Sequence, residues 1–223
     1  MFDIKKICMI YDMEKEEKMY ALKGFDLKLP DKGLIGIIGP SGSGKSTLMY
    51  CISTLKKPTE GSIVYNGREL CECSNAQREQ LRRSEFGFVF QKHYLVPYMG
   101  AVDNVMVAAN GKDKELRKRA EDILKELGIG EREFNKKPAK LSGGQCQRVA
   151  IARAVINDPK VIFADEPTAS LDHENAYNVM KILKEHSKDR LVLVVTHDKS
   201  ILKDADSVIE MWDGEISVNG EAE

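Results

Sequence analysis

A glycine-rich run near residue 40 carries the strongest chemical signal in the sequence. Gly39–Ser46 fits the pattern G-x-x-x-x-G-K-[ST], which defines a phosphate-binding loop, or P-loop. Its backbone N–H groups can curl around an anion, and a helix that begins there adds the positive end of its dipole. Lys45 supplies a charge for the β- and γ-phosphates, and the Ser46 hydroxyl is placed for Mg²⁺. We therefore expect a magnesium nucleotide, rather than an empty turn, at Gly39, Pro40, Ser41, Gly42, Ser43, Gly44, Lys45, Ser46 and Thr47.

Two adjacent carboxylates end a later apolar run and could complete this chemistry. Val161–Glu166 reads Val-Ile-Phe-Ala-Asp-Glu, which predicts a buried strand beside the strand of the P-loop. Asp165 can hold Mg²⁺, while Glu166 can orient or deprotonate the attacking water. A solvated strand end is the usual explanation for such a pair, but the P-loop favours the catalytic one.

A second set of anion-binding groups opens another expected helix. Leu141, Ser142, Gly143, Gly144 and Gln145, the signature loop below, present N–H donors at a helix N-terminus. One nucleotide cannot easily bind to both the P-loop and the signature loop of one chain. The economical arrangement is two chains head to tail, each completing the other's site.

Alternating strands and helices must position these residues. An antiparallel pair, Ile4–Tyr11 and about 25–29, is expected to flank a charged turn at Asp12–Lys18, with hairpins at Asn66-Gly67 and Asp213-Gly214. Apolar runs predict strands at Leu34–Ile38, Phe86–Phe90, Val161–Ala164 and Leu191–Thr196, and polar–apolar periodicity predicts helices at Lys45–Leu55, Lys114–Leu127, Gly143–Asn157 and His173–His186.

This alternation predicts an α/β fold with a single domain over residues 1–223. Residues of about 1–92 and 141–223 would form the catalytic core, with an antiparallel β subdomain at its start. The segment of about 93–140 favours helix and would form a helical subdomain inserted into that core.

Composition excludes several classes of protein. With 34 Lys and Arg against 35 Asp and Glu, the net charge of −1 argues against a nucleic-acid partner. The longest apolar runs are about six residues, whereas a membrane span needs about 20. No leader pattern indicates secretion, and five scattered cysteines fit free thiols in a reducing cytosol.

In order and spacing, these motifs resemble those of the nucleotide-binding domain of ATP-binding-cassette (ABC) proteins over nearly the whole chain. Gly39–Ser46 resembles the family's Walker A motif, Val161–Asp165 its Walker B strand and Leu141–Gln145 its signature. The order of the remaining motifs also matches. Tyr11 corresponds to the adenine-stacking aromatic residue, Gln91 to the Q-loop and Glu166 to the catalytic carboxylate. Ser170–Asp172 corresponds to the D-loop and His197 to the H-loop.

The resemblance implies a role for each of these residues. Tyr11 would stack on adenine, Gln91 would sense Mg²⁺ and the attacking water, and His197 would touch the γ-phosphate. Asp172 would help the two chains of a dimer communicate. Tyr11 can also be read as an ordinary strand residue, His197 as structural and Gln91 as a plain strand-end residue.

The family further implies ATP and Mg²⁺ as cofactors and a homodimer that forms when ATP binds. It implies an ATPase subunit that energises transport through integral membrane permease subunits from the cytoplasmic, inner face of the membrane. Four short segments resemble the branch for lipoprotein release and for macrolide or antimicrobial-peptide export: Lys57–Gly61, Gly87–Gln91, Leu95–Pro97 and Val102–Val105. The alternative is a regulatory ABC ATPase of the cell-division type, which acts on a membrane partner without transport.

Two further hypotheses concern surfaces. Tyr94, Leu95, Tyr98 and Met99 are apolar for a loop that follows Gln91, so they could contact the membrane partner. Packing inside the helical subdomain is the alternative. Cys146 lies near a helix N-terminus that would favour a thiolate, unless the thiol is buried and inert.

Overall fold

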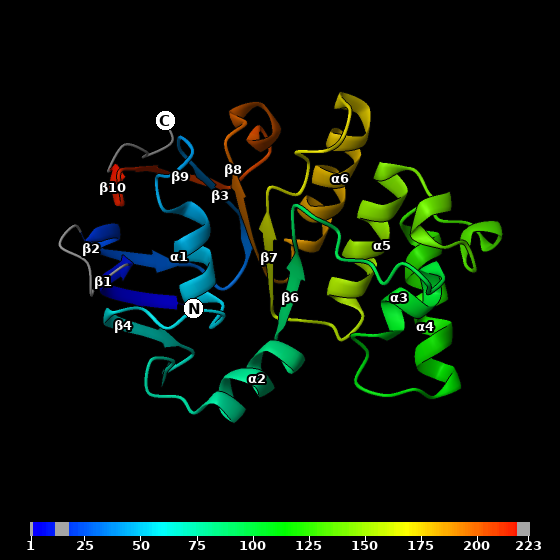
Figure 1. The fold of residues 1–223 in the computed structure, drawn as a ribbon, viewed down its shortest axis with the longest axis horizontal. Helices are drawn as coiled ribbons and strands as arrows, with labels where there is room; N and C mark the ends of the chain where they lie inside the picture. The colour runs from blue at the N-terminus through cyan, green and yellow to red at the C-terminus, as the bar shows by residue number, and fades with distance from the viewer. Residues whose placement is uncertain (1, 12–17, 218–223) are drawn as a thin grey trace.

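Two β-sheets flanked by helices form the part of the chain that the computed structural model describes, residues 2–11 and 18–217 (Figure 1). The predicted turn at Asp12–Lys18 falls outside these residues except for Lys18. The strands are β1 Phe2–Tyr11, β2 Met19–Leu29, β3 Gly33–Ile38, β4 Glu60–Tyr65, β5 Arg68–Glu69, β6 Phe86–Val89, β7 Val161–Asp165, β8 Leu191–Thr196, β9 Ser207–Trp212 and β10 Glu215–Ser217. The α-helices are α1 Lys45–Ile52, α2 Asn75–Ser84, α3 Ala101–Met106, α4 Lys114–Glu126, α5 Gly143–Val155 and α6 His173–His186.

The larger sheet has the strand order β10-β9-β3-β8-β7-β6 and is parallel except for the terminal β9–β10 hairpin. The predicted closing hairpin is therefore confirmed. One expectation about this sheet was wrong, because β8 lies between the P-loop strand β3 and the carboxylate strand β7. The carboxyl ends of all three strands still meet at one edge, which brings their loops together.

Side chains of the central strands alternate between two hydrophobic cores. Ile162 and Val194 face a core shared with α3 to α6, whereas Phe163 and Leu193 face a core shared with α1 and the smaller sheet. All four side chains are fully buried. This burial on both faces explains why β7 and β8 read as continuous apolar runs instead of alternating ones.

The smaller sheet is antiparallel with the order β2-β1-β4-β5, as the N-terminal pattern predicts. Asn66 and Gly67 join β4 to β5 with φ angles of 48° and 79°. Positive φ at both residues is what a type I′ hairpin requires, so the Asn-Gly turn is confirmed.

Residues 93–140 contain α3, α4 and two short 3₁₀ turns, and they lie at the opposite end of the molecule from the smaller sheet (Figure 1). Val102 and Leu124 of this segment pack in one core with Val149 of α5, so α5 joins the segment to the sheet. α1 ends three residues before the predicted Leu55, because Thr54 has a left-handed backbone with φ of 61°.

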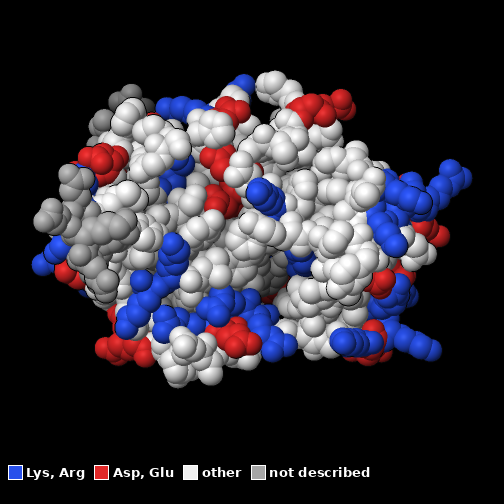
Figure 2. Space-filling model, in the orientation of Figure 1, with Lys and Arg blue, Asp and Glu red and all other residues white. Residues whose placement is uncertain are grey.

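No helix within residues 2–11 and 18–217 is both long and apolar enough to cross a membrane. On the face drawn in Figure 2, basic side chains lie mostly along the lower edge and the right-hand end, with acidic ones among them. Neither sign of charge covers this face continuously, in agreement with the net charge of −1.

Candidate active site

A cavity of about 920 Å³ lies where the carboxyl ends of the central strands meet the start of α1. Its size suits a ligand larger than a single anion. The residues that line it are Tyr11, Met19, Tyr20, Ala21, Pro40, Ser41, Gly42, Gly44, Lys45, Ser46, Thr47, Gln91, Glu166, His197 and Asp213. The structure therefore gathers most of the predicted P-loop residues with Tyr11, Gln91, Glu166 and His197.

The P-loop backbone takes a path that only glycine follows without strain. Gly44, the residue before α1, has φ of 95°, and a Cβ there would collide with the carbonyl oxygen of Ala21. Gly42 has φ of 83° and faces open space. Left-handed glycines separated by single residues turn the chain so that its N–H groups can surround an anion.

Lys45 is held inside this loop. Its ammonium group donates to the carbonyl oxygens of Gly39 and Pro40, both at 2.8 Å, and only 7% of the residue is exposed. Burial lowers the pKa of Lys45, and the charges of Glu166 and Asp165 oppose this shift. A buried ammonium close to carboxylates can exchange carbonyl partners for phosphate oxygens with little movement.

Asp165, at the end of β7, receives two hydrogen bonds from α1. The Ser46 hydroxyl donates to Oδ1 at 2.9 Å, and the Tyr50 hydroxyl donates to Oδ2 at 2.8 Å. Burial, together with Asp165, raises the pKa of the Tyr50 phenol well above its usual range. The Ser46 hydroxyl and the Asp165 carboxylate form a pair of hard oxygen donors, the kind that Mg²⁺ prefers.

Glu166 follows with a strained backbone, because φ of 48° is uncommon for a residue other than glycine. Its N–H donates to the carbonyl oxygen of Val195 at 2.8 Å, which ties the turn to β8. The Thr196 hydroxyl donates to Oε2 at 3.2 Å, and His197 Nδ1 lies 2.9 Å from Oε1. Both carboxylate oxygens of Glu166 are thus oriented at the cavity wall.

Tyr11, the last residue of β1, also lines the cavity. Its hydroxyl lies 3.5 Å from the Thr47 hydroxyl and accepts a hydrogen bond of 2.8 Å from Lys56. The Lys56 ammonium is 4.5 Å from the centre of the ring. These contacts connect the ring to α1 and to the loop that follows it.

The signature loop lies apart from this cavity: among the described residues that line it, none belongs to Leu141–Gln145. Ser142 caps α5, since its hydroxyl accepts from the Gln145 N–H at 3.1 Å, and the Gln145 side chain accepts from the Ser142 N–H at 2.9 Å. Asp172 caps α6 by accepting from Asn175. Hydrogen bonds from Asn175 lower the pKa of Asp172.

The N-termini of α5 and α6 lie side by side. A Cβ on Gly144 would come within about 2.5 Å of the Asn175 amide oxygen, and Arg148 donates to that oxygen at 3.4 Å. Asn175 therefore connects the signature loop to Asp172. Sequence spacing gave no sign of this contact.

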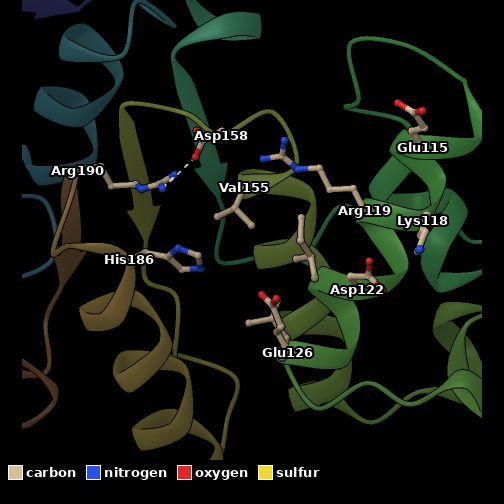
Figure 3. A pocket seen from close by; sticks show the side chains of 11 residues that line it. Glu115, Lys118, Arg119, Asp122, Glu126, Val155, Asp158, His186 and Arg190 are labelled. Carbon is tan, nitrogen blue, oxygen red and sulfur yellow. Dashed lines mark ion pairs between the residues drawn. The ribbon is translucent and has the colours of Figure 1, made fainter.

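A second cleft, of about 450 Å³, separates α4 from the end of α6 (Figure 3). Its lining mixes charges of both signs, including Arg119, Glu126 and an Arg190–Asp158 ion pair of 3.0 Å. Burial and the charge of Arg190 lower the pKa of His186. Among the described residues that line it there is no glycine-rich loop of the kind that surrounds a phosphate, so the P-loop cavity remains the candidate site.

The burial of the side chains bears on both surface hypotheses. Cys146 is only 8% exposed, its thiol donates to the Pro138 carbonyl oxygen at 3.6 Å, and burial raises its pKa. Burial thus outweighs the helix dipole, and the predicted thiolate is wrong. In the loop after Gln91, Tyr94 and Tyr98 are 67% and 71% exposed, but Leu95 and Met99 are half-buried.

The chain also uses site residues that the motifs did not indicate. Tyr50 and Thr196 orient the two carboxylates, and Met19, Tyr20 and Asp213 line the cavity. Of these five residues, only Tyr50 could have been identified from the sequence pattern, because it lies four residues after Ser46 and therefore on the same face of the expected helix.

Comparison with known proteins agrees with this geometry. The sequence profile of the family described as "ABC transporter" matches residues 22–169. An uncharacterized ABC transporter ATP-binding protein of Methanocaldococcus jannaschii, MJ1508, is 42% identical, with 97% of each chain covered. The macrolide export ATP-binding/permease protein MacB of a Shewanella species is 43% identical over 90% of this chain, which spans 31% of MacB.

Among solved structures, the dimeric post-hydrolysis ATP-binding cassette MJ0796, bound to ADP and Pi, superposes with a TM-score of 0.89. It is 39% identical, and 97% of each chain is covered. MJ0796 is also from Methanocaldococcus jannaschii.

The chain therefore belongs to the ABC transporter family, and the resemblance stated from its motifs is confirmed. It has the α/β fold of a P-loop ABC ATPase. It is an ATP-binding subunit of an ABC transporter and hydrolyses ATP.

Proposed function

We propose that two copies of this chain hydrolyse MgATP in composite sites, and that this work drives separate membrane permease subunits. The observation that supports the proposal most is that the two anion-binding loops, the P-loop and the signature loop, lie apart in one chain. The P-loop cavity gathers the charges and carboxylates that handle phosphate, whereas the signature loop lies outside its lining. A head-to-tail pair of chains would place the signature loop of one copy over the P-loop of the other.

Within one such site, the residues would divide the work. Lys45 and the P-loop N–H groups bind the β- and γ-phosphates, and Tyr11 stacks on adenine. Glu166 accepts the proton of the attacking water, since its Oε1 and Oε2 are already oriented by His197 and Thr196.

The opposite chain would supply the rest. The signature loop would direct its backbone N–H groups at the γ-phosphate from Leu141, Ser142, Gly143, Gly144 and Gln145. Asp172 lies beside this loop at the start of α6. The Ser142 hydroxyl accepts from Gln145, so its own proton stays free to donate to an anion.

The residues present fit a magnesium ion. Ser46 and Asp165 would hold it, with Gln91 at the same cavity, and all three offer oxygen ligands. The ion would neutralise phosphate charge that develops during hydrolysis.

We also propose the division into a catalytic core, residues 1–92 and 141–223, and a helical subdomain, residues 93–140. The loop after Gln91 would carry the contact with the permease, because Tyr94 and Tyr98 are exposed aromatic side chains. Arg153 fixes this loop by donating to the carbonyl oxygens of His93 and Tyr94. Five free cysteines support a position at the cytoplasmic face of the membrane.

The partner contact can be tested by co-purification from membranes. Tyr98→Glu is expected to release the permease while ATPase activity of the isolated chain stays within about two-fold, because an exposed side chain tolerates substitution. Tyr177→Glu is the matched control, as Tyr177 is 63% exposed on α6. Equal recovery of the permease with both variants would contradict this surface.

The composite site can be tested with Glu166→Gln. The amide cannot accept the water's proton, so turnover should fall at least about 100-fold while ATP still binds. Trapped ATP should then hold the chains together as dimers, which size-exclusion chromatography with light scattering would detect. A variant that binds ATP without hydrolysing it and stays monomeric would count against the dimer.

A further inference from the structure

The Walker B carboxylate is held by a side chain that the nucleotide-binding motifs do not include. Both oxygens of Asp165 accept hydrogen bonds from α1: Oδ1 from Ser46 and Oδ2 from Tyr50. Ser46 and Tyr50 are four residues apart, so they project from one face of the helix toward the end of β7. Asp165 is 7% exposed, which leaves water little access to replace either donor.

These two donors differ in what a metal ion would do to them. The Ser46 hydroxyl is itself an expected magnesium ligand, so its bond to Asp165 would be given up or reorganised when the ion is present. The Tyr50 hydroxyl is bonded to the other carboxylate oxygen and need not take part in that exchange. Its phenol stays protonated at neutral pH and remains a donor.

We propose that Tyr50 is a positioning residue, which holds the Asp165 carboxylate in the orientation that binds Mg²⁺. The inference rests on the magnesium site proposed above and deepens it. Hydrogen bonds to a carboxylate near a metal fix its rotation before the ion arrives, and their loss commonly lowers metal affinity 10- to 100-fold. Tyr50 would thereby raise affinity for the ion without touching the nucleotide.

Tyr65 provides a matched control elsewhere in the chain. Its hydroxyl donates to the Glu85 carboxylate at 2.9 Å, and burial raises its phenol pKa as it does for Tyr50. The Tyr65–Glu85 pair does not line the P-loop cavity. Tyr65→Phe therefore removes the same kind of bond at a place where no metal is expected.

The test measures metal binding directly, with Mn²⁺ as the probe. The chain is saturated with a non-hydrolysable ATP analogue, and free Mn²⁺ is followed by electron paramagnetic resonance. Tyr50→Phe should weaken Mn²⁺ binding about 10-fold, whereas Tyr65→Phe should leave it within about two-fold of the unchanged chain. Binding of a fluorescent ATP analogue in EDTA should be equal in all three proteins.

A kinetic measurement gives a second readout. The Mg²⁺ concentration for half-maximal ATPase activity should rise about 10-fold in Tyr50→Phe, while the rate at saturating Mg²⁺ falls less than about three-fold. A residue that only supports packing would not move the metal requirement in this selective way.

Mn²⁺ affinity within about two-fold of the unchanged chain in Tyr50→Phe would overturn the inference. An unchanged chain that binds the analogue but shows no Mn²⁺ site would instead overturn the proposed magnesium site. If Tyr50→Phe lacks a cooperative thermal transition, Tyr50→Met replaces it, since Met is helix-compatible and cannot donate. The same 10-fold loss is then expected, and unchanged affinity would overturn the inference.

Discussion

The P-loop and the signature loop are both glycine-containing turns that open a helix, yet their surroundings differ. Around the P-loop, side chains from β1, from β2 and from the residues that directly follow β7 and β8 converge on one cavity. Lys45 already satisfies its charge with loop carbonyl groups. At the signature loop, the neighbouring element is α6, which approaches Gly144 through Asn175. The hydrogen bonds of Ser142 and Asp172 there cap the N-termini of α5 and α6.

This difference explains how two similar turns can serve different partners. The cavity around the P-loop is lined by residues of one chain, so nucleotide affinity should not require the signature loop of a second chain. The signature loop has its helix end satisfied, but among the described residues none of Leu141–Gln145 lines the cavity of its own chain. Its contribution should therefore become measurable only when a second chain is present.

The largest expected effect is a difference in ATP affinity between a P-loop variant and a signature-loop variant. Lys45→Ala removes a buried ammonium and should weaken ATP binding about 100-fold, because charged hydrogen bonds in buried sites are worth about 2 to 5 kcal/mol. Ser142→Arg should leave ATP affinity within about two-fold and abolish hydrolysis by blocking the second chain. Fluorescent ATP titration checks both; strong ATP binding by Lys45→Ala would remove Lys45 from its role.

A smaller effect is expected at the hydroxyl that orients Glu166. Thr196→Val preserves the shape of the side chain and deletes the donor to Oε2. The turnover number should fall about 10-fold with KM unchanged, as one hydrogen bond of about 1.4 kcal/mol is lost in the transition state. Steady-state ATPase kinetics measure this, and a change confined to KM would contradict the assignment.

Two capping boxes lie among the described residues, and comparing them separates a structural from a functional role of Ser142. Ser74 and Gln77 form the same reciprocal cap on α2 that Ser142 and Gln145 form on α5. Ser74→Ala and Ser142→Ala should each lower the free energy of unfolding by about 1 kcal/mol in urea titrations. Only Ser142→Ala should also reduce ATPase activity, and an equal reduction by both variants would reject a functional role for the Ser142 hydroxyl.

The smallest effect concerns Cys146. Because burial raises its thiol pKa, little thiolate is present at neutral pH, and a maleimide reagent should modify Cys146 much more slowly than after unfolding in urea. Mass spectrometry of labelled peptides gives the rates. Rapid modification of Cys146 in the folded chain would contradict this expectation and support a reactive thiolate instead.

Much of this fold could be predicted from the sequence because its strongest signals are local. The Asn66-Gly67 hairpin, the buried strand at Val161–Asp165 and the helix that begins at Gly143 each depend on a few adjacent residues, and each lies where it was expected. The resemblance to a known family then placed Tyr11, Gln91 and His197 at the same cavity.

The features that were missed depend on contacts between distant segments. Strand order decides that β8 separates β3 from β7, and no local pattern encodes it. Cys146 is buried, and its thiol donates to the carbonyl oxygen of Pro138, eight residues earlier in the chain. The bond between Tyr50 and Asp165 joins residues 115 positions apart, so helix periodicity could point to Tyr50 but not to its acceptor.

The central claim is that one ATP is hydrolysed by the P-loop of one chain and the signature loop of another. A tandem fusion of a Lys45→Ala copy to a Ser142→Arg copy tests this claim most directly. It holds one composite site with an intact P-loop, Glu166 and signature loop, and a second site with both lesions. The measurement is its ATPase rate beside fusions of each variant to itself and an unchanged tandem.

The account predicts partial ATPase activity in the mixed fusion and almost none in the two self-fusions. Inactivity of all three fusions, while the unchanged tandem is active, would contradict a composite site that can work singly. A disulfide between cysteines introduced at Ser41 of one chain and Gly143 of the other then tests the head-to-tail arrangement itself, because Gly143 is exposed and a Cβ there meets no atom closer than 3.9 Å. Its formation between chains with ATP is the predicted result, and its absence in an ATP-trapped Glu166→Gln dimer would contradict the central claim.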